Sequence, residues 1–215
     1  MKTTNIFFSI ILFMGFTSFA QNEPKAEQLV KEVLEKVNSY DNMVIDFTYS
    51  LENKEQNMKQ ETRGNVSIQG DKYVLNLMGT KQIFDGNKIY TIVPEDEEVT
   101  ISDFDANDSE QITPSKMLTF FEDGYIYKMD ILQDVKGRKI QYVELVAMDS
   151  ENEMKQILLG VDKHTKHVYN LIQVQQDDTK IEFKVTKFQK NTQLSSKHFE
   201  FDRSKYADYY INELD

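Results

Sequence analysis

The feature that most constrains this fold is a long series of short segments in which apolar and polar residues alternate. The first segment places Met43, Ile45, Phe47, Tyr49 and Leu51 on one side, as in a half-buried β-strand. Similar segments follow through most of the chain, and helical stretches do not regularly separate them. This order predicts a meandering antiparallel sheet rather than a parallel sheet built from βαβ units.

Turn-forming dipeptides mark several boundaries between these segments. Gly70-Asp71 and Asp85-Gly86 each stand between two apolar stretches, as at the tip of a β-hairpin. The count is about eleven strands, with a last short signal at 198–201, which predicts a sheet that is strongly curved or partly closed. The other expected strands are 43–51, 66–68, 73–77, 82–84, 89–93, 99–101, 125–132, 139–148, 154–161, 167–175 and 180–188.

Two segments have helical spacing instead. Residues 23–40 carry apolar side chains at intervals of three and four, which form a single stripe on a helix. Pro24 suits the first turn of that helix. A short second helix is expected at 116–121, opened by Thr113-Pro114-Ser115. We therefore expect a mainly β fold with two or three helices.

The N-terminus predicts a secretory signal peptide at 1–20. Lys2 precedes an apolar run at 6–16, and Ser18-Phe19-Ala20 supplies the small residues of a cleavage site. The run is shorter than the ~20 residues that a membrane-spanning helix needs. We expect a mature single domain at 21–215, with an uncleaved anchor as the alternative. Because the chain has no cysteine that could be lipidated, the mature protein is expected to be soluble in the periplasm.

Composition argues against several classes of partner. The 36 acidic and 25 basic residues give a net charge of −11, which disfavours binding to nucleic acids and to anionic membrane surfaces. The 40% hydrophobic and 12% aromatic content is enough to fill a core, so disorder is not expected.

The sequence offers little for catalysis. A hydrolase needs a nucleophile with a base beside it, but the chain has no cysteine and no Gly-x-Ser-x-Gly motif. Its histidines are His164, His167 and His198, and the first two fall in or beside an expected surface turn. We therefore expect that the protein is not an enzyme.

Metal and cofactor sites are also not expected. His164-x-x-His167 lacks an evident third ligand. Residues 103–107 match the first ligand positions of a calcium loop, but Asp108 replaces its glycine and Pro114 replaces its final glutamate. Isolated glycines form no phosphate-binding loop.

Apolar surface is the remaining candidate for function. If the two helices pack tightly on the concave face of a curved sheet, their apolar residues simply form a core. If the helices stand apart from the sheet, the same residues line a cavity for acyl chains, which need apolar area and no specific donors. Phe120-Phe121 on a helix too short to be stable alone suits a movable lid.

The order of several motifs resembles the LolA family of periplasmic lipoprotein carriers over nearly the whole mature chain. Each motif is weak alone, and their shared order carries the resemblance. They are Tyr40-x-x-Met43-x-x-Asp46-Phe47 after the first helix, Gly64-Asn65-Val66-Ser67-Ile68, the hairpin 85–94, the Pro-initiated segment 113–118, and the tail 191–202 that contains Phe199-x-Phe201.

The resemblance implies an unclosed, strongly curved antiparallel barrel of about eleven strands with a helical lid. It implies that lipoprotein acyl chains enter the apolar space, without nucleotide, metal or other cofactor. The expected partners are an inner-membrane transporter that supplies cargo and an outer-membrane acceptor, and the protein is expected to be a monomer. The expected lipid-binding residues of the cavity and lid are Phe47, Tyr49, Val66, Ile68, Leu75, Leu77, Ile89, Met117, Leu118 and Phe121.

The sequence departs from the family pattern at two places. Gln69-Gly70 stands where well-studied members have an Arg-Pro pair whose arginine holds the lid, and Tyr90 stands where many relatives have tryptophan. A general lipid or glycolipid carrier on the same scaffold therefore remains an alternative. An outer-membrane acceptor would need a lipidated N-terminal cysteine, which this chain lacks.

Overall fold

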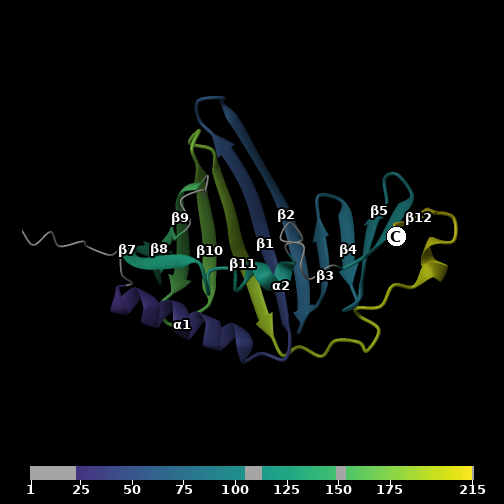
Figure 1. Ribbon diagram of the computed structural model, residues 1–215, viewed down its shortest axis with the longest axis horizontal. Coiled ribbons are helices and arrows are strands. Elements are labelled where there is room, and N and C mark those ends of the chain that lie inside the picture. Colours follow the sequence, from purple (N-terminus) through teal and green to yellow (C-terminus); the bar gives the residue numbers. More distant parts are fainter. Residues whose placement is uncertain (1–22, 105–112, 149–153, 215) are drawn as a thin grey trace, which may run out of the picture.

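The computed structural model describes residues 23–104, 113–148 and 154–214. They form one strongly curved sheet of twelve strands in the order β12-β6-β5-β4-β3-β2-β1-β11-β10-β9-β8-β7 (Figure 1). All pairs are antiparallel except β12 and β6, and the sheet ends at β12 and β7 without closing. The strands are β1 Met43–Asn53, β2 Met58–Gln69, β3 Lys72–Leu77, β4 Thr80–Phe84, β5 Lys88–Val93, β6 Glu98–Asp103, β7 Tyr125–Val135, β8 Arg138–Ala147, β9 Met154–Asp162, β10 Val168–Gln175, β11 Lys180–Lys190 and β12 Tyr210–Leu214.

The predicted open, curved sheet is confirmed, but the strand count is twelve rather than about eleven. The strand expected at 198–201 is wrong, because these residues form a turn and an extended link. The alternation of Phe199 and Phe201 reflects the packing of their rings and not a strand. Phe199 is buried against the convex side of the sheet, and the ring of Phe201 stacks on Tyr90 with 4.6 Å between centroids. The final strand is β12, which the sequence pattern did not reveal.

The helices are shorter than expected, and among the described residues only the first is longer than about one turn. The first, α1 Pro24–Asn38, matches the prediction and has proline in its first turn. The second, α2, covers only Pro114–Met117, and turns replace the helix expected as far as residue 121. It begins early because the Thr113 hydroxyl accepts a hydrogen bond from the Lys116 amide at 3.2 Å. The remaining helical turn is a short 3₁₀ segment, Arg203–Tyr206.

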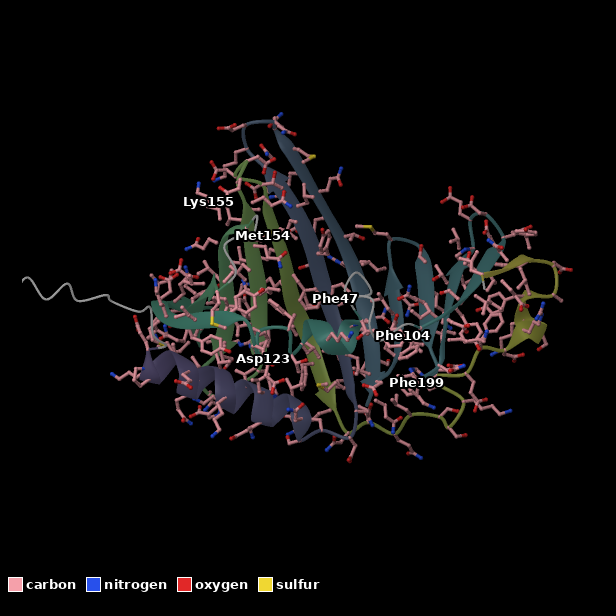
Figure 2. The ribbon with its side chains drawn as sticks, viewed as in Figure 1. Phe47, Phe104, Asp123, Met154, Lys155 and Phe199 are labelled. Carbon is pink, nitrogen blue, oxygen red and sulfur yellow. The ribbon has the colours of Figure 1, made fainter. Side chains whose placement is uncertain are left out.

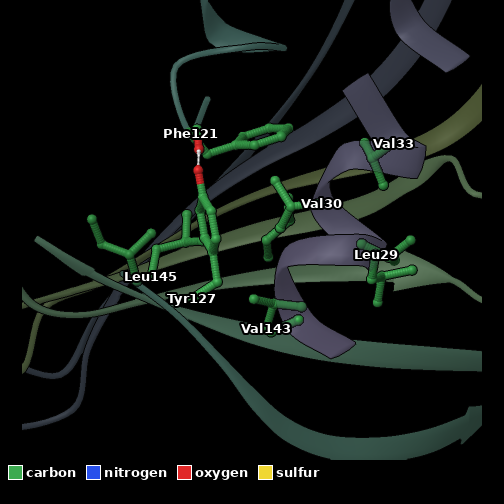
Figure 3. Packing of buried hydrophobic residues seen from close by; sticks show 11 residues of the cluster. Leu29, Val30, Val33, Phe121, Tyr127, Val143 and Leu145 are labelled. Carbon is green, nitrogen blue, oxygen red and sulfur yellow. Dashed lines mark hydrogen bonds between the residues drawn. The ribbon is translucent and has the colours of Figure 1, made fainter. Parts of the chain in front are cut away.

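The helix α1 lies across the concave side of β7, β8 and β9 (Figures 1 and 3). Its stripe of Leu29, Val30 and Val33 is buried against apolar side chains of these strands, including Val143. At its start, the Glu23 amide donates to the Tyr127 carbonyl at 2.9 Å. The helix is therefore fixed to β7 at the end of the sheet. Neither described helix is long and apolar enough to cross a membrane.

The convex side of β3 to β6 has a separate apolar cluster. Val74, Ile83, Ile92 and Val99 form its buried centre, and Phe199 in the link before β12 covers it. This packing explains the course of the C-terminal segment, which runs along the lower edge of the sheet in Figure 1 and around its end before β12 joins β6. The C-terminal segment therefore covers the convex side, and another segment of the chain covers the concave side of the central strands.

Candidate functional site: an apolar cavity under residues 113–122

A cavity of about 140 Å³ lies between the middle of the sheet and the cover segment, which we define as residues 113–122. The side chains that line it are apolar, and the Tyr49 hydroxyl is the one polar group that they carry. Such a wall can hold hydrocarbon but offers almost no hydrogen bonds. The lining residues are Ile45, Phe47, Tyr49, Val66, Ile68, Leu75, Leu77, Pro114, Leu118, Phe120, Phe121, Leu159, Val168, Leu171 and Phe183.

The floor of the cavity follows from strand register. Ile45 on β1 pairs with Val66 on β2, which pairs with Leu75 on β3. Because paired residues share a face of the sheet, each such row lays a continuous apolar band across the concave side. Two rows further along β1, Tyr49 pairs with Phe183 of β11. Strands that are distant in sequence thereby build one surface.

Phe47 occupies the centre of this floor (Figure 2). It is 3% exposed, and its ring lies 4.5 Å from that of Phe183, centroid to centroid. On β2 it faces Gly64, whose missing side chain leaves space for the ring. A larger residue at 64 would push the ring towards the cavity, so the shape of the cavity depends on this glycine.

The cover segment is held at its C-terminal end by Tyr127 of β7. The Tyr127 hydroxyl donates to the carbonyls of Phe121 and Glu122 at 2.7 and 2.8 Å, and Figure 3 shows the first of these bonds. Burial, and then the nearby charges of Asp123, Glu27 and Glu122, raise the pKa of Tyr127. The hydroxyl therefore stays protonated and keeps donating.

Two apolar side chains of the cover segment, Leu118 and Phe121, are buried against the sheet. Phe121 is 1% exposed and Leu118 is 8% exposed. Phe120 packs edge-on against Phe121 and against Tyr125 at the start of β7, with 5.5 and 5.8 Å between centroids. The segment is thus anchored by buried rings and one tyrosine, with a helix of only four residues.

The size of the cavity limits what fits without movement. An engineered apolar cavity of about 150 Å³ holds one benzene molecule, so about six carbons fit here. A full acyl chain is much longer. It would need the cover segment to move away from the floor.

The structure places eight of the ten predicted residues around this one cavity. Ile89 is absent from the wall, because it lies on β5 across from Phe84, and belongs to the apolar cluster next to the cavity. Met117 lies in α2, but its side chain is not among those that the structure describes. The eight are Phe47, Tyr49, Val66, Ile68, Leu75, Leu77, Leu118 and Phe121. That they bind lipid stays a prediction.

Part of the opposite wall was not predicted from the sequence. Leu159 on β9, Leu171 on β10 and Phe183 on β11 share one row, because each pairs with the next. Alternation along each strand gives two possible faces, and only the pairing shows that these residues face the cavity. The apolar runs themselves were visible, so the missing signal was register.

The histidines lie outside the cavity wall. The Tyr40 hydroxyl and Nε2 of His167 are 2.8 Å apart, and the His167 ring lies 4.2 Å from that of Phe188. Burial and then the charge of Lys190 lower the pKa of His167. His164 is exposed in the β9–β10 turn. Among the described residues, no group of three or more histidine and acidic side chains is placed to hold a metal.

The structure also shows where two other features of the sequence lie, the calcium-like segment and Gln69-Gly70. Of the calcium-like segment, Asp103 forms an ion pair with Lys88 at 3.0 Å, and residues 105–107 lie outside the described residues. Gln69 is exposed and ends β2 before the tight turn at Gly70. Gly70 and Lys116 of the cover segment line the same shallow hollow, so this turn adjoins the edge of the cover.

Comparison with known families gives one match over most of the chain. The family model described as "Outer membrane lipoprotein carrier protein LolA" matches residues 38–202. This range contains the cavity floor, the cover segment and eleven of the twelve strands, all but β12. No curated protein matches the chain in sequence.

Solved structures agree on the fold. An uncharacterized conserved protein from Thermus thermophilus has a TM-score of 0.59 and 8% identity, covering 88% of this chain and 99% of its own. The lipoprotein LppX from Mycobacterium tuberculosis has a TM-score of 0.51 and 9% identity, covering 81% and 100%. A LolA superfamily protein from Nitrosomonas europaea has a TM-score of 0.43 and 11% identity, covering 83% and 98%. At such identities the first two show a shared fold alone.

Proposed function

Because the chain belongs to the LolA family of outer membrane lipoprotein carriers, we propose that it is a carrier that shields lipoprotein acyl chains in its apolar cavity. It would ferry these lipoproteins across the periplasm from the inner to the outer membrane. The observation that carries the proposal is the cavity itself, since its wall joins seven strands or segments and is lined by side chains that are apolar but for one hydroxyl.

The energetics suit a carrier that must also release its cargo. Each methylene removed from water contributes about 0.8 kcal/mol, so the six or so carbons that fit the closed cavity would contribute roughly 5 kcal/mol. That free energy corresponds to a dissociation constant between millimolar and micromolar. Stable loading therefore requires more of the chain to enter.

The cover segment is the part that we propose acts as a lid. Its helix is too short to be stable by itself, and its apolar side chains can exchange contact with the floor for contact with an acyl chain. The exchange costs little because apolar area stays buried in both states. Leu118 and Phe121 would then touch cargo in the loaded form.

The remaining roles follow from the carrier proposal. Residues 1–20 would direct export and be removed, and the mature domain would work as a periplasmic monomer. An inner-membrane transporter would load it and an outer-membrane acceptor would unload it. We further propose that it catalyses no reaction and uses no cofactor.

A general lipid or glycolipid carrier is the second candidate. The apolar wall favours it equally, because nothing in that wall distinguishes one acyl chain from another. Purification of the tagged protein from its own periplasm, followed by mass spectrometry of what it holds, separates the two. Acylated N-terminal peptides of full-length lipoproteins are expected. Free glycolipid would favour the second candidate, and a protein devoid of any acyl compound would contradict both.

A further inference from the structure

In the outer half of β2, charged and uncharged residues alternate, and the carrier proposal does not use this feature. It reads Lys59-Gln60-Glu61-Thr62-Arg63, and successive side chains of a strand lie on opposite faces. Thr62 pairs with Tyr49 of the cavity wall, and Gln60 pairs with Leu51 on the same side. The uncharged residues of this stretch therefore lie on the concave face and the charged residues on the convex face.

The same division continues across the neighbouring strands. On β11, Ile181 and Phe183 lie on the concave face, whereas Lys180 and Glu182 lie on the convex face. Throughout β1 to β5, β10, and β11 as far as Val185, every concave position in the described chain is uncharged. Since 28% of the sequence is charged, this face has been kept free of charge well beyond the buried floor.

Burial alone does not explain this pattern, because several of these positions reach solvent. Gln60 is exposed, and the others are partly exposed. They adjoin the floor by register: Thr62 lies beside Tyr49, and Gln82 lies beside Leu75. We call the set the uncharged rim, and it comprises Gln60, Thr62, Thr80, Gln82, Thr91 and Gln173.

The uncharged rim can form hydrogen bonds but cannot neutralise an ion. Gln82 already accepts a hydrogen bond from the Tyr73 hydroxyl at 2.6 Å and donates to the Thr91 hydroxyl at 3.3 Å. Amide and hydroxyl groups can both donate and accept, so they suit ester, amide and hydroxyl groups of a ligand. On the cover segment, the Lys116 ammonium lies over the Phe104 ring, 5.7 Å from its centroid, and stays exposed to water.

We propose that the uncharged rim receives the uncharged linkage region of an acylated ligand, the esters or amides that join its chains to the cargo. The same rim would discriminate against acyl ligands with ionised heads, such as fatty-acid anions and phospholipid phosphates. An ionised head would lose hydration here without gaining a counter-charge, and the net charge of −11 adds repulsion of anions. This inference rests on the proposed function, because it assumes that the chains lie in the cavity.

The test compares two probes with the same chain, monopalmitoylglycerol and palmitate, titrated below their aggregation concentrations at pH 8. Palmitate is ionised there, because carboxyl pKa values lie near 4. The neutral probe is expected to bind at least about tenfold more tightly, which corresponds to 1.4 kcal/mol. Equal affinity, or tighter binding of palmitate, would overturn the proposal.

A matched pair of variants tests whether the uncharged rim causes the preference for the neutral probe. Thr62→Lys adds a cation to the uncharged rim, whereas Ser50→Lys adds one to the convex face of the same hairpin, where Ser50 pairs with Glu61 and Glu182. Thr62→Lys is expected to abolish the preference by tightening palmitate binding, in a manner that about 0.5 M salt weakens. Ser50→Lys is expected to leave the preference unchanged. Identical behaviour of the two variants would contradict the proposed role of the rim.

The outcomes also separate this inference from the carrier proposal. If the native protein binds both probes equally, the cavity hypothesis stands and the rim hypothesis fails. If it binds neither probe, both hypotheses fail together. Unchanged melting temperatures of the two lysine variants would show that any difference in binding arises at the site.

Discussion

The ring of Phe47 lies directly over Gly64, so that a β-carbon at position 64 would stand 2.5 Å from Cζ of Phe47 and 2.9 Å from the Asn76 carbonyl oxygen. Real side chains do not approach so closely, so any larger residue forces a shift. Phe47 is the easier of the two neighbours to displace, because its contacting atoms are the far end of a side chain, and its ring lines the cavity, so its displacement changes the cavity wall. The glycine of the second strand therefore sets the position of the ring that forms the cavity floor.

Gly64→Ala is expected to lower the free energy of unfolding by about 1–3 kcal/mol, the usual cost of an overpacked core, and to weaken binding of an acyl probe. Chemical denaturation and probe titration measure the two effects. Gly64→Ala combined with Phe47→Leu should recover part of both, because the smaller side chain relieves one of the two clashes. A double variant whose losses simply add would show that the ring is not the strained neighbour.

Tyr127→Phe is expected to loosen the cover segment. The substitution removes the hydroxyl that donates to the Phe121 and Glu122 carbonyls, and a lost buried hydrogen bond costs about 1–3 kcal/mol. Uptake of an acyl probe should become faster in stopped-flow measurements, while stability falls. Tyr210→Phe removes an exposed hydroxyl from β12 and serves as the control. Slower uptake by Tyr127→Phe would contradict the role of the cover segment as a lid.

Leu118→Lys is expected to cut acyl loading strongly, because it places a charge at a wall position that is 8% exposed in the closed form. The chain should still fold, since the short cover segment can swing the lysine into water. Met78→Lys, at a position 63% exposed in a turn, is the control. Loading by Leu118→Lys equal to that of the control would reject the lid assignment.

Asp162 predicts a loss of stability in acid. Burial opposes its ionisation, but the amides of Thr165 and His164 and the Arg138 guanidinium outweigh burial and hold the pKa of Asp162 below its usual range. A depressed folded-state pKa gives stabilisation above the unfolded-state pKa of about 3.9, and this stabilisation is lost as the pH falls through the folded value. Asp162→Asn should therefore be less stable than the native protein at pH 7, and the difference should shrink below pH 4. A difference independent of pH would contradict this account.

Local patterns in the sequence predicted much of the sheet and of the floor. Alternation from Met43 to Leu51 identified the concave residues of β1, and Gly70-Asp71 marked the hairpin that joins β2 to β3. These features depend on residues that are neighbours in the sequence, so a single sequence is enough to identify them. The correct face of β1 followed because its other face carries Asp46, Thr48 and Ser50.

What the sequence did not reveal depends on distant contacts. Phe199 and Phe201 alternate like a strand, but they pack on the convex side of β3 to β6, and only the folded sheet shows that surface. The parallel pairing of β12 with β6 joins segments more than a hundred residues apart. The end of α2 was wrong for a more local reason, since the hydroxyl of Tyr127, five and six residues further along the chain, donates to the carbonyls of Glu122 and Phe121 outside any helix.

The most direct measurement is photo-crosslinking with a palmitoyl chain that carries a diazirine near its end, followed by mapping of the adducts by mass spectrometry. The account predicts adducts at Phe47, Leu118, Leu171 and their neighbours around the cavity, and their loss in Leu118→Lys. Adducts confined to the convex face, such as the surface around Tyr142 and Ile172, or no adducts at all, would contradict the claim that this cavity holds acyl chains.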